Sequence, residues 1–142
     1  LLEQMSGMKP TKTITQKRIA GWGIRPGLPI GCKVTIRSKK KIEDLLSRLL
    51  QAKDNELNQK QFDSGGNIAF GIHEYINIPG VNYDPKIGII GLQACITLQR
   101  PGFRIKKRKN QKKKIHKRHK ISQKEAIEFM KKNFNVKIGE KE

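Results

Sequence analysis

The side chains of this sequence that could do chemistry are mostly cations. Residues 104–120 contain eleven lysines or arginines and no acid. A second group lies in the stretch 30–37, where Lys33, Thr35 and Arg37 alternate with apolar side chains. Cations and hydroxyls in such patterns contact the phosphate oxygens of nucleic acids. These residue types therefore favour a nucleic-acid-binding protein.

The charge of the whole sequence is strongly positive and unevenly distributed. The formal net charge is +19 over 142 residues. Residues 4–42 hold ten cations and no acid, residues 43–84 hold seven acids against three cations, and residues 85–124 hold fourteen cations and no acid. We expect a folded protein with one anion-binding side and one neutral or acidic side, rather than an evenly solvated lysine-rich surface.

Catalytic, metal and membrane functions find little support in the sequence. No combination of Ser, His and Asp, or of Cys and His, suggests a nucleophile, and the glycine-rich stretches lack the lysine and spacing of a P-loop. Cys32 and Cys95 are far apart, so we expect two free thiols in the core. We expect no cofactor and no metal site, His116 and His119 included. No apolar run approaches the roughly 18 residues that span a bilayer, and we interpret the protein as cytoplasmic.

The stretch Ile30–Arg37 predicts the strand around which the protein is organised. Its alternation places four side chains on a buried face, namely Ile30, Cys32, Val34 and Ile36. The open face then carries Gly31, Lys33, Thr35 and Arg37. A period of two is typical of a strand with one buried face. The same pattern predicts a strand over 68–72 that continues through Ile76 and Ile78, and another over 92–98 with a polar, uncharged outer face.

Helical patterns fill much of the remainder. The apolar spacing predicts a helix over Lys39–Lys53, and Ser122 with Glu125 forms a capping box that opens a second helix. Leu1–Met5 is typical of the end of a helix closed by Gly7, which suggests that N-terminal residues are missing. Val136 and Ile138 predict a short closing strand, after which the last residues should fray. Trp22 lies between two glycines, and we expect an anchor of the loop rather than a base-stacking platform.

Together these elements predict an α+β fold in a single domain, residues 1–142. The alternation gives its sheet one apolar face and one open, polar face. A basic loop over residues 9–23 and an extended basic insertion over residues 104–120 complete it. The insertion offers only Ile105 and Ile115 as apolar anchors, so we expect it to be disordered without RNA.

Gly27–Arg37 resembles the signature of a universal family, the L-five family of large-subunit ribosomal proteins that bind 5S rRNA. Four further segments also stand in the family's order, namely residues 6–10, 62–67, 78–84 and 100–103. The resemblance therefore covers nearly the whole chain. The insertion at 104–120 resembles the archaeal and eukaryotic branch. In that family an N-terminal strand with its own RNA contact precedes the position of Leu1.

The resemblance implies an antiparallel sheet that packs helices on one face and presents a polar, RNA-binding face on the other, which agrees with the alternation. It also implies a protein of the cytoplasmic ribosome. It would bind 5S rRNA in the central protuberance, bridge it to the large-subunit rRNA, contact the peptidyl-site tRNA and adjoin neighbouring ribosomal proteins. The residues implied at the 5S rRNA are Met8, Lys9, Lys33, Thr35 and Arg37. Those of the tRNA-facing loop are Lys12, Thr13, Thr15, Gln16, Lys17 and Arg18. The cations of the extension, implied to contact rRNA, are Arg104, Lys106, Lys107, Arg108, Lys109, Lys112, Lys113, Lys114, Lys117, Arg118 and Lys120.

Two positions depart from the family. Met8 stands where the family usually has glutamine and cannot make an amide hydrogen bond, and Trp22 stands where it usually has phenylalanine. The alternative to a ribosomal protein is a free-standing basic RNA-binding protein or RNA chaperone, with no fixed place in a particle.

Overall fold

The antiparallel pair β4 (Asn67–Ile72) and β5 (Leu92–Thr97) forms one wall of the hydrophobic core in this computed structural model, which describes residues 1–139. On β4 every second side chain is buried: Ile68, Phe70 and Ile72. On β5 the inward side chains are half-buried, and Gln93, Cys95 and Thr97 on the other face are exposed. Both strands and the polar outer face of β5 confirm the prediction from alternation.

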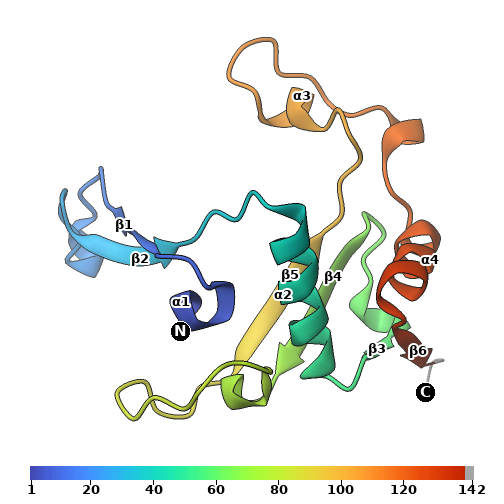
Figure 1. Ribbon diagram of the computed structural model, residues 1–142. Helices are drawn as coiled ribbons and strands as arrows, with labels where there is room; N and C mark the ends of the chain where they lie inside the picture. Colours follow the sequence, from blue (N-terminus) through green and yellow to red (C-terminus); the bar gives the residue numbers. More distant parts are fainter. Residues whose placement is uncertain (140–142) are drawn as a thin grey trace.

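Helices α2 (Lys39–Gln51) and α4 (Gln123–Phe134) pack against this wall (Figure 1). Burial of the apolar side chains rises along α2: Ile42 is 40% exposed, whereas Leu50 is fully buried. Only the second half of α2 therefore belongs to the core, and its lysine-rich first turn lies in solvent. The predicted capping box opens α4: the Ser122 hydroxyl accepts from the Glu125 N–H at 3.4 Å, and the Glu125 carboxylate accepts from the Ser122 N–H at 3.1 Å.

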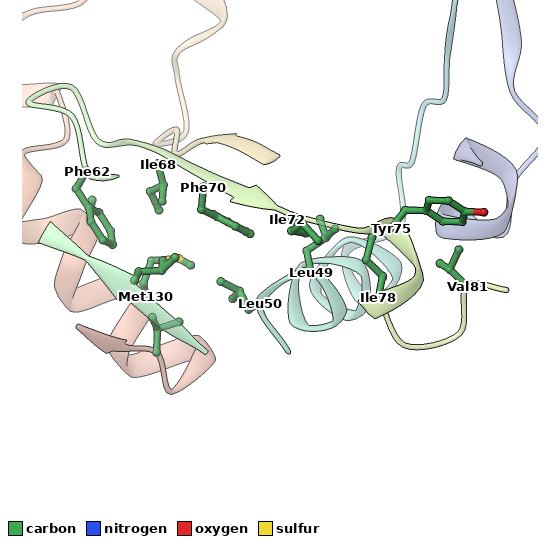
Figure 2. Close-up of a cluster of buried hydrophobic side chains, with 13 residues drawn as sticks. Leu49, Leu50, Phe62, Ile68, Phe70, Ile72, Tyr75, Ile78, Val81 and Met130 are labelled. Carbon is green, nitrogen blue, oxygen red and sulfur yellow. The ribbon is translucent and has the colours of Figure 1, made fainter. Parts of the chain in front are cut away.

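Figure 2 shows the buried side chains of β4 facing those of α2 and α4. Tyr75 is fully buried, and its hydroxyl accepts a hydrogen bond from the Asp84 N–H at 3.0 Å. The core as a whole consists of Leu49, Leu50, Leu57, Phe62, Ile68, Phe70, Ile72, Tyr75, Ile78, Val81, Ala126, Met130 and Val136. Burial of this apolar surface is the main source of folding free energy.

The strands of residues 1–139 pair as three separate two-stranded sheets, and the α+β fold class is confirmed. β1 (Thr11–Ile14) pairs with β2 (Pro29–Lys33) in an antiparallel hairpin, while β3 (Glu56–Asn58) pairs with β6 (Lys137–Gly139) in parallel. The shorter helices are α1 (Leu2–Ser6), α3 (Arg104–Lys107) and the 3₁₀ helices η1 (Ala20–Trp22), η2 (Gln59–Gln61), η3 (Tyr75–Asn77) and η4 (Lys117–His119). The sheet predicted as continuous is thus divided.

Both ends of the described chain are attached to the core. α1 ends at Gly7, whose φ of 61° is left-handed, as the sequence predicts. Arg48 of α2 donates to the carbonyl of Met5 at 2.8 Å, which holds α1 against α2. Val136 is buried and β6 closes on β3, which confirms the closing strand. The fraying expected of the last residues concerns 140–142, which lie outside the described part.

Several predictions about burial are wrong. β2 ends at Lys33, and Ile30 is 57% exposed rather than buried. Cys32 and Cys95 are free thiols but exposed, since the described chain places nothing over β2 and Cys95 lies on the outer face of β5. Ile76 does not continue a strand, because the chain turns through η3 to bury Tyr75.

Candidate nucleic-acid interface

The β1–β2 hairpin projects away from the core (Figure 1). Thr15 fastens its long loop, because its N–H and its hydroxyl both donate to the carbonyl of Leu28, at 3.0 and 2.8 Å. Gly31 lies opposite Thr13, and a Cβ at Gly31 would come within 3.0 Å of the Thr13 hydroxyl. The loop predicted over residues 9–23 therefore contains a strand, and it is part of a hairpin with defined register.

The residues predicted to contact 5S rRNA lie at one end of this hairpin or on the two chain segments that adjoin it. Thr11 pairs with Lys33, so Lys9 and Thr35 lie on the chain segments that enter β1 and leave β2. Residues 34–38 lead on to α2 outside any strand, yet the alternation persists: Val34 and Ile36 are half-buried, while Thr35 and Arg37 are exposed. Exposed side chains are therefore present at Lys9, Lys33, Thr35 and Arg37, whereas Met8 is half-buried.

The residues predicted to face tRNA divide into two groups. Thr13 and Thr15 are half-buried and serve the hairpin itself. The remaining side chains are exposed, namely Lys12, Gln16, Lys17 and Arg18. The structure thus leaves three cations and an amide of this loop accessible to a partner.

Trp22 is the accessible residue that sequence reasoning missed. It stands in η1 between Gly21 and Gly23 and is 77% exposed, so the prediction of an anchor is wrong. Other apolar side chains of the hairpin are exposed as well: Ile14, Ile19, Leu28 and Ile30. A tryptophan that contacts no core offers a flat aromatic surface on which a base or ribose could stack. The flanking glycines, which leave no neighbouring side chain to cover it, were the available signal.

The basic segment 104–120 forms an arch beyond the end of β5 (Figure 1). Where the sequence predicts disorder without RNA, the structure describes α3, a turn and η4. The Arg108 guanidinium donates to the carbonyl of Gln111, with nitrogen–oxygen distances of 3.0 and 2.7 Å. Ile105 and Ile115 are half-buried, which confirms them as the apolar anchors. The eleven cations of this segment are exposed except Arg108, which is half-buried.

The positive charge of both regions is uncompensated within the described chain. Its three ion pairs are Lys39–Glu43 at 3.7 Å, Arg48–Asp44 at 3.3 Å and Arg100–Glu125 at 2.8 Å. None of them involves residues 9–37 or 104–120. Self-repulsion of such a surface falls when phosphates neutralise it.

Carboxylates are stabilised elsewhere, at exposed turns. The N–H of Ser122 and then the guanidinium of Arg100 lower the pKa of Glu125. The side chain of Asn67 and then the N–H of Ser64 lower the pKa of Asp63. Both acids therefore support local structure at the N-cap of α4 and at the turn before β4, and neither is arranged as an acid–base pair.

The described chain holds neither a candidate metal cluster nor a membrane-spanning helix. Residues 1–139 contain no cluster of three or more histidine, cysteine or acidic side chains suited to a metal ion. His116 instead accepts from the Arg118 N–H at 3.3 Å through Nδ1. No helix in the same range is both long and apolar enough to cross a bilayer.

Comparison with known proteins gives one consistent family. Residues 29–129 match the family model that describes the C-terminus of the ribosomal L-five family. The chain is 48% identical over 141 residues to a large ribosomal subunit protein uL5 of Sulfurisphaera tokodaii, covering 99% of this chain and 79% of the relative. It is 46% identical to that of Nitrosopumilus maritimus and 44% identical to that of Nanoarchaeum equitans, with 97% of this chain covered in each and 79% and 81% of the relatives.

Proposed function

The chain belongs to the ribosomal L-five family, and we propose that it binds 5S rRNA within the large ribosomal subunit. Membership makes it a structural ribosomal protein rather than an enzyme. The observation that carries the proposal is the exposed, acid-free surface of residues 9–37 and 104–120, whose cations have no acidic partner in the described chain. A polyanion is the partner that such a surface fits.

The 5S rRNA would contact the end of the hairpin. Lys33 and Arg37 offer cations there, and the exposed Thr35 between them offers a hydroxyl donor. Lys9 adds a cation from the segment that enters β1. Met8 is half-buried and its N–H donates to the Ser6 hydroxyl at 3.3 Å, so its thioether is the group that it would offer to the RNA.

The long loop of the hairpin would contact the peptidyl-site tRNA. Gln16, Lys17 and Arg18 are exposed on it, Lys12 is exposed on the adjoining β1, and Trp22 adds an uncovered ring. Cations bind the tRNA backbone in any sequence, and a ring stacks on bases or riboses without strong sequence preference.

The arch of residues 104–120 would contact the large-subunit rRNA and so bridge it to 5S rRNA. In Figure 1 it lies beyond the end of β5, apart from the hairpin. Two basic regions separated in this way can bind two RNA segments at once. The central protuberance, with its neighbouring ribosomal proteins, is the place in the cytoplasmic ribosome that we propose for it.

A direct binding comparison tests this function. Fluorescence anisotropy would measure the affinity of the full chain for 5S rRNA and for an unrelated structured RNA of equal length, at the same physiological salt. We expect clearly tighter binding to 5S rRNA, because protein surfaces read RNA by shape. Equal affinities would contradict the proposal and favour the alternative, a free-standing RNA chaperone, because phosphate contacts alone carry no sequence information.

A further inference from the structure

A cleft lies between the arch of residues 104–120 and the end of the β4–β5 wall. Its volume is about 760 Å³, within the range of about 300–1,000 Å³ typical of ligand pockets. One side is formed by the turn before β4 and the end of β5, the other by the arch and by Ile121, which precedes the N-cap of α4. The basic segment therefore forms one side of the cleft, and no residue of the β1–β2 hairpin lines it.

The lining of the cleft combines two kinds of side chain. Seven of its lining residues are lysines of the arch, and none is an acid. Leu98, Phe103, Ile115 and Ile121 add an apolar surface to the same cleft. A surface that only neutralised the outside of a duplex would need the lysines but not the apolar part. Apolar surface with a cationic rim fits instead a planar base and its flanking phosphates.

Two polar side chains at the end of β5 also line the cleft. Thr97 and Gln99 are both exposed, and neither side chain makes a hydrogen bond within the described chain. A hydroxyl and an amide can each donate and accept. They are therefore available to the polar edge of a base that enters between the wall and the arch.

Contacts between the two ends of the arch, and one within it, hold its shape. The cleft is therefore formed without a ligand. His119 at its far end donates from Nε2 to the carbonyl of Pro101 at 2.9 Å, and its ring packs on Phe103 with centroids 5.4 Å apart. Within the arch, the N–H of Lys113 donates to the carbonyl of Ile105 at 3.2 Å. A preformed site reduces the ordering cost of binding.

We propose that this cleft binds one unpaired nucleotide of an RNA, with the base against the apolar lining and the neighbouring phosphates on the lysines. The inference deepens the proposed function, on which the identity of the RNA rests. It changes the expected role of the arch from charge neutralisation to recognition of a flipped-out or looped nucleotide. An acidic peptide would satisfy the lysines but would leave the apolar lining without a planar partner.

The test uses two RNA heptamers with identical phosphates. One carries a single adenine on its central ribose and abasic riboses elsewhere, and the other is abasic throughout. Anisotropy with the full chain should give about 5- to 150-fold tighter binding for the heptamer with adenine, the range expected for stacking of one base. Equal affinities of the two heptamers would overturn the proposal. Hepta-glutamate, an acidic peptide, is then added as a competitor at the same concentration as a competing RNA heptamer. Equal displacement of both bound heptamers by this peptide would also overturn the proposal.

Matched variants locate the effect. Ile115→Ser should bring the affinity ratio of the two heptamers towards one. Ile89→Ser, the same change at an exposed isoleucine outside the cleft lining and the arch, should leave the ratio unchanged. Lys113→Gln should weaken both heptamers equally. An equal loss of the ratio in both isoleucine variants would overturn the assignment to the cleft. The comparison of 5S rRNA with an unrelated RNA is separate, so either proposal can fail alone.

Discussion

Replacing three lysines of the arch by glutamine should flatten the salt dependence of RNA binding. Lys112, Lys113 and Lys114 are exposed, line the cleft and take part in no ion pair within the described chain. If each neutralises one phosphate, the slope of log affinity against log salt should fall by roughly two to three units, at about 0.7–0.9 per phosphate. Between 50 and 200 mM salt this amounts to a difference of about 20- to 40-fold.

The assay is fluorescence anisotropy of labelled 5S rRNA over that salt range, with thermal unfolding measured in parallel. The melting temperature should barely change, because the three side chains contribute no buried surface to the core. A matched control replaces Lys131, Lys132 and Lys137 by glutamine, which removes the same charge from exposed positions of α4 and β6. This control should retain the slope of the original chain.

The two triple variants together test whether residues 112–114 contact phosphates. An unchanged slope for the arch variant would show that these lysines are solvated in the complex. An equal decrease in both variants would show that total charge matters and that the arch has no special contact. Either result would refute the assignment of phosphate contacts to residues 112–114.

Four further predictions test other parts of the structure. Thr35→Val should weaken 5S rRNA binding by about 0.5–1.5 kcal/mol in anisotropy while leaving the melting temperature intact, and unfolding of the variant would instead place Thr35 in the core. Trp22→Ala should change the unfolding free energy by no more than about 0.5 kcal/mol in denaturant titrations, since its ring is 77% exposed. A larger loss would show that Trp22 does anchor the loop. Leu50→Ala should cost about 2–5 kcal/mol in the same titrations, because Leu50 is fully buried, and a smaller cost would contradict the described core. Glu125→Gln removes a carboxylate whose folded pKa lies below its ordinary value of 4.5, so the stability it contributes is present above that pH and is lost as the pH falls through the folded pKa; a gap between original and variant that stays constant down to acid pH would refute this.

Local patterns in the sequence were sufficient for the elements that pack against the core. The alternation in β4 and β5 and the apolar spacing of α2 and α4 each repeat over several residues, and period alone assigns the element and its buried face. The capping box at Ser122 and the left-handed Gly7 are equally local, because the atoms that satisfy the helix ends lie within four residues. The segregation of charge also needed no structure, since it runs along the chain.

Whether a strand face is buried depends on which other segment packs over it. The local sequence pattern does not contain that information. The pattern of residues 30–37 has the same period as β4, yet nothing in the described chain covers β2, so Ile30 and Cys32 are exposed. Trp22 was misassigned for the same reason. At Ile76 the pattern of a strand continued, but burial of Tyr75 required the chain to turn instead.

Contacts between distant segments were decided only by the tertiary structure. The parallel pairing of Leu57 with Ile138 joins residues 81 positions apart (138 − 57), and neither three-residue strand has enough pattern to select its partner. The cleft likewise needs the arch, the end of β5 and the turn before β4 to meet. From the sequence the lysines of residues 104–120 indicated phosphate binding. Only the fold showed that Leu98 and Ile121, from the two sides of this segment, line one cleft together with Ile115 and the lysines.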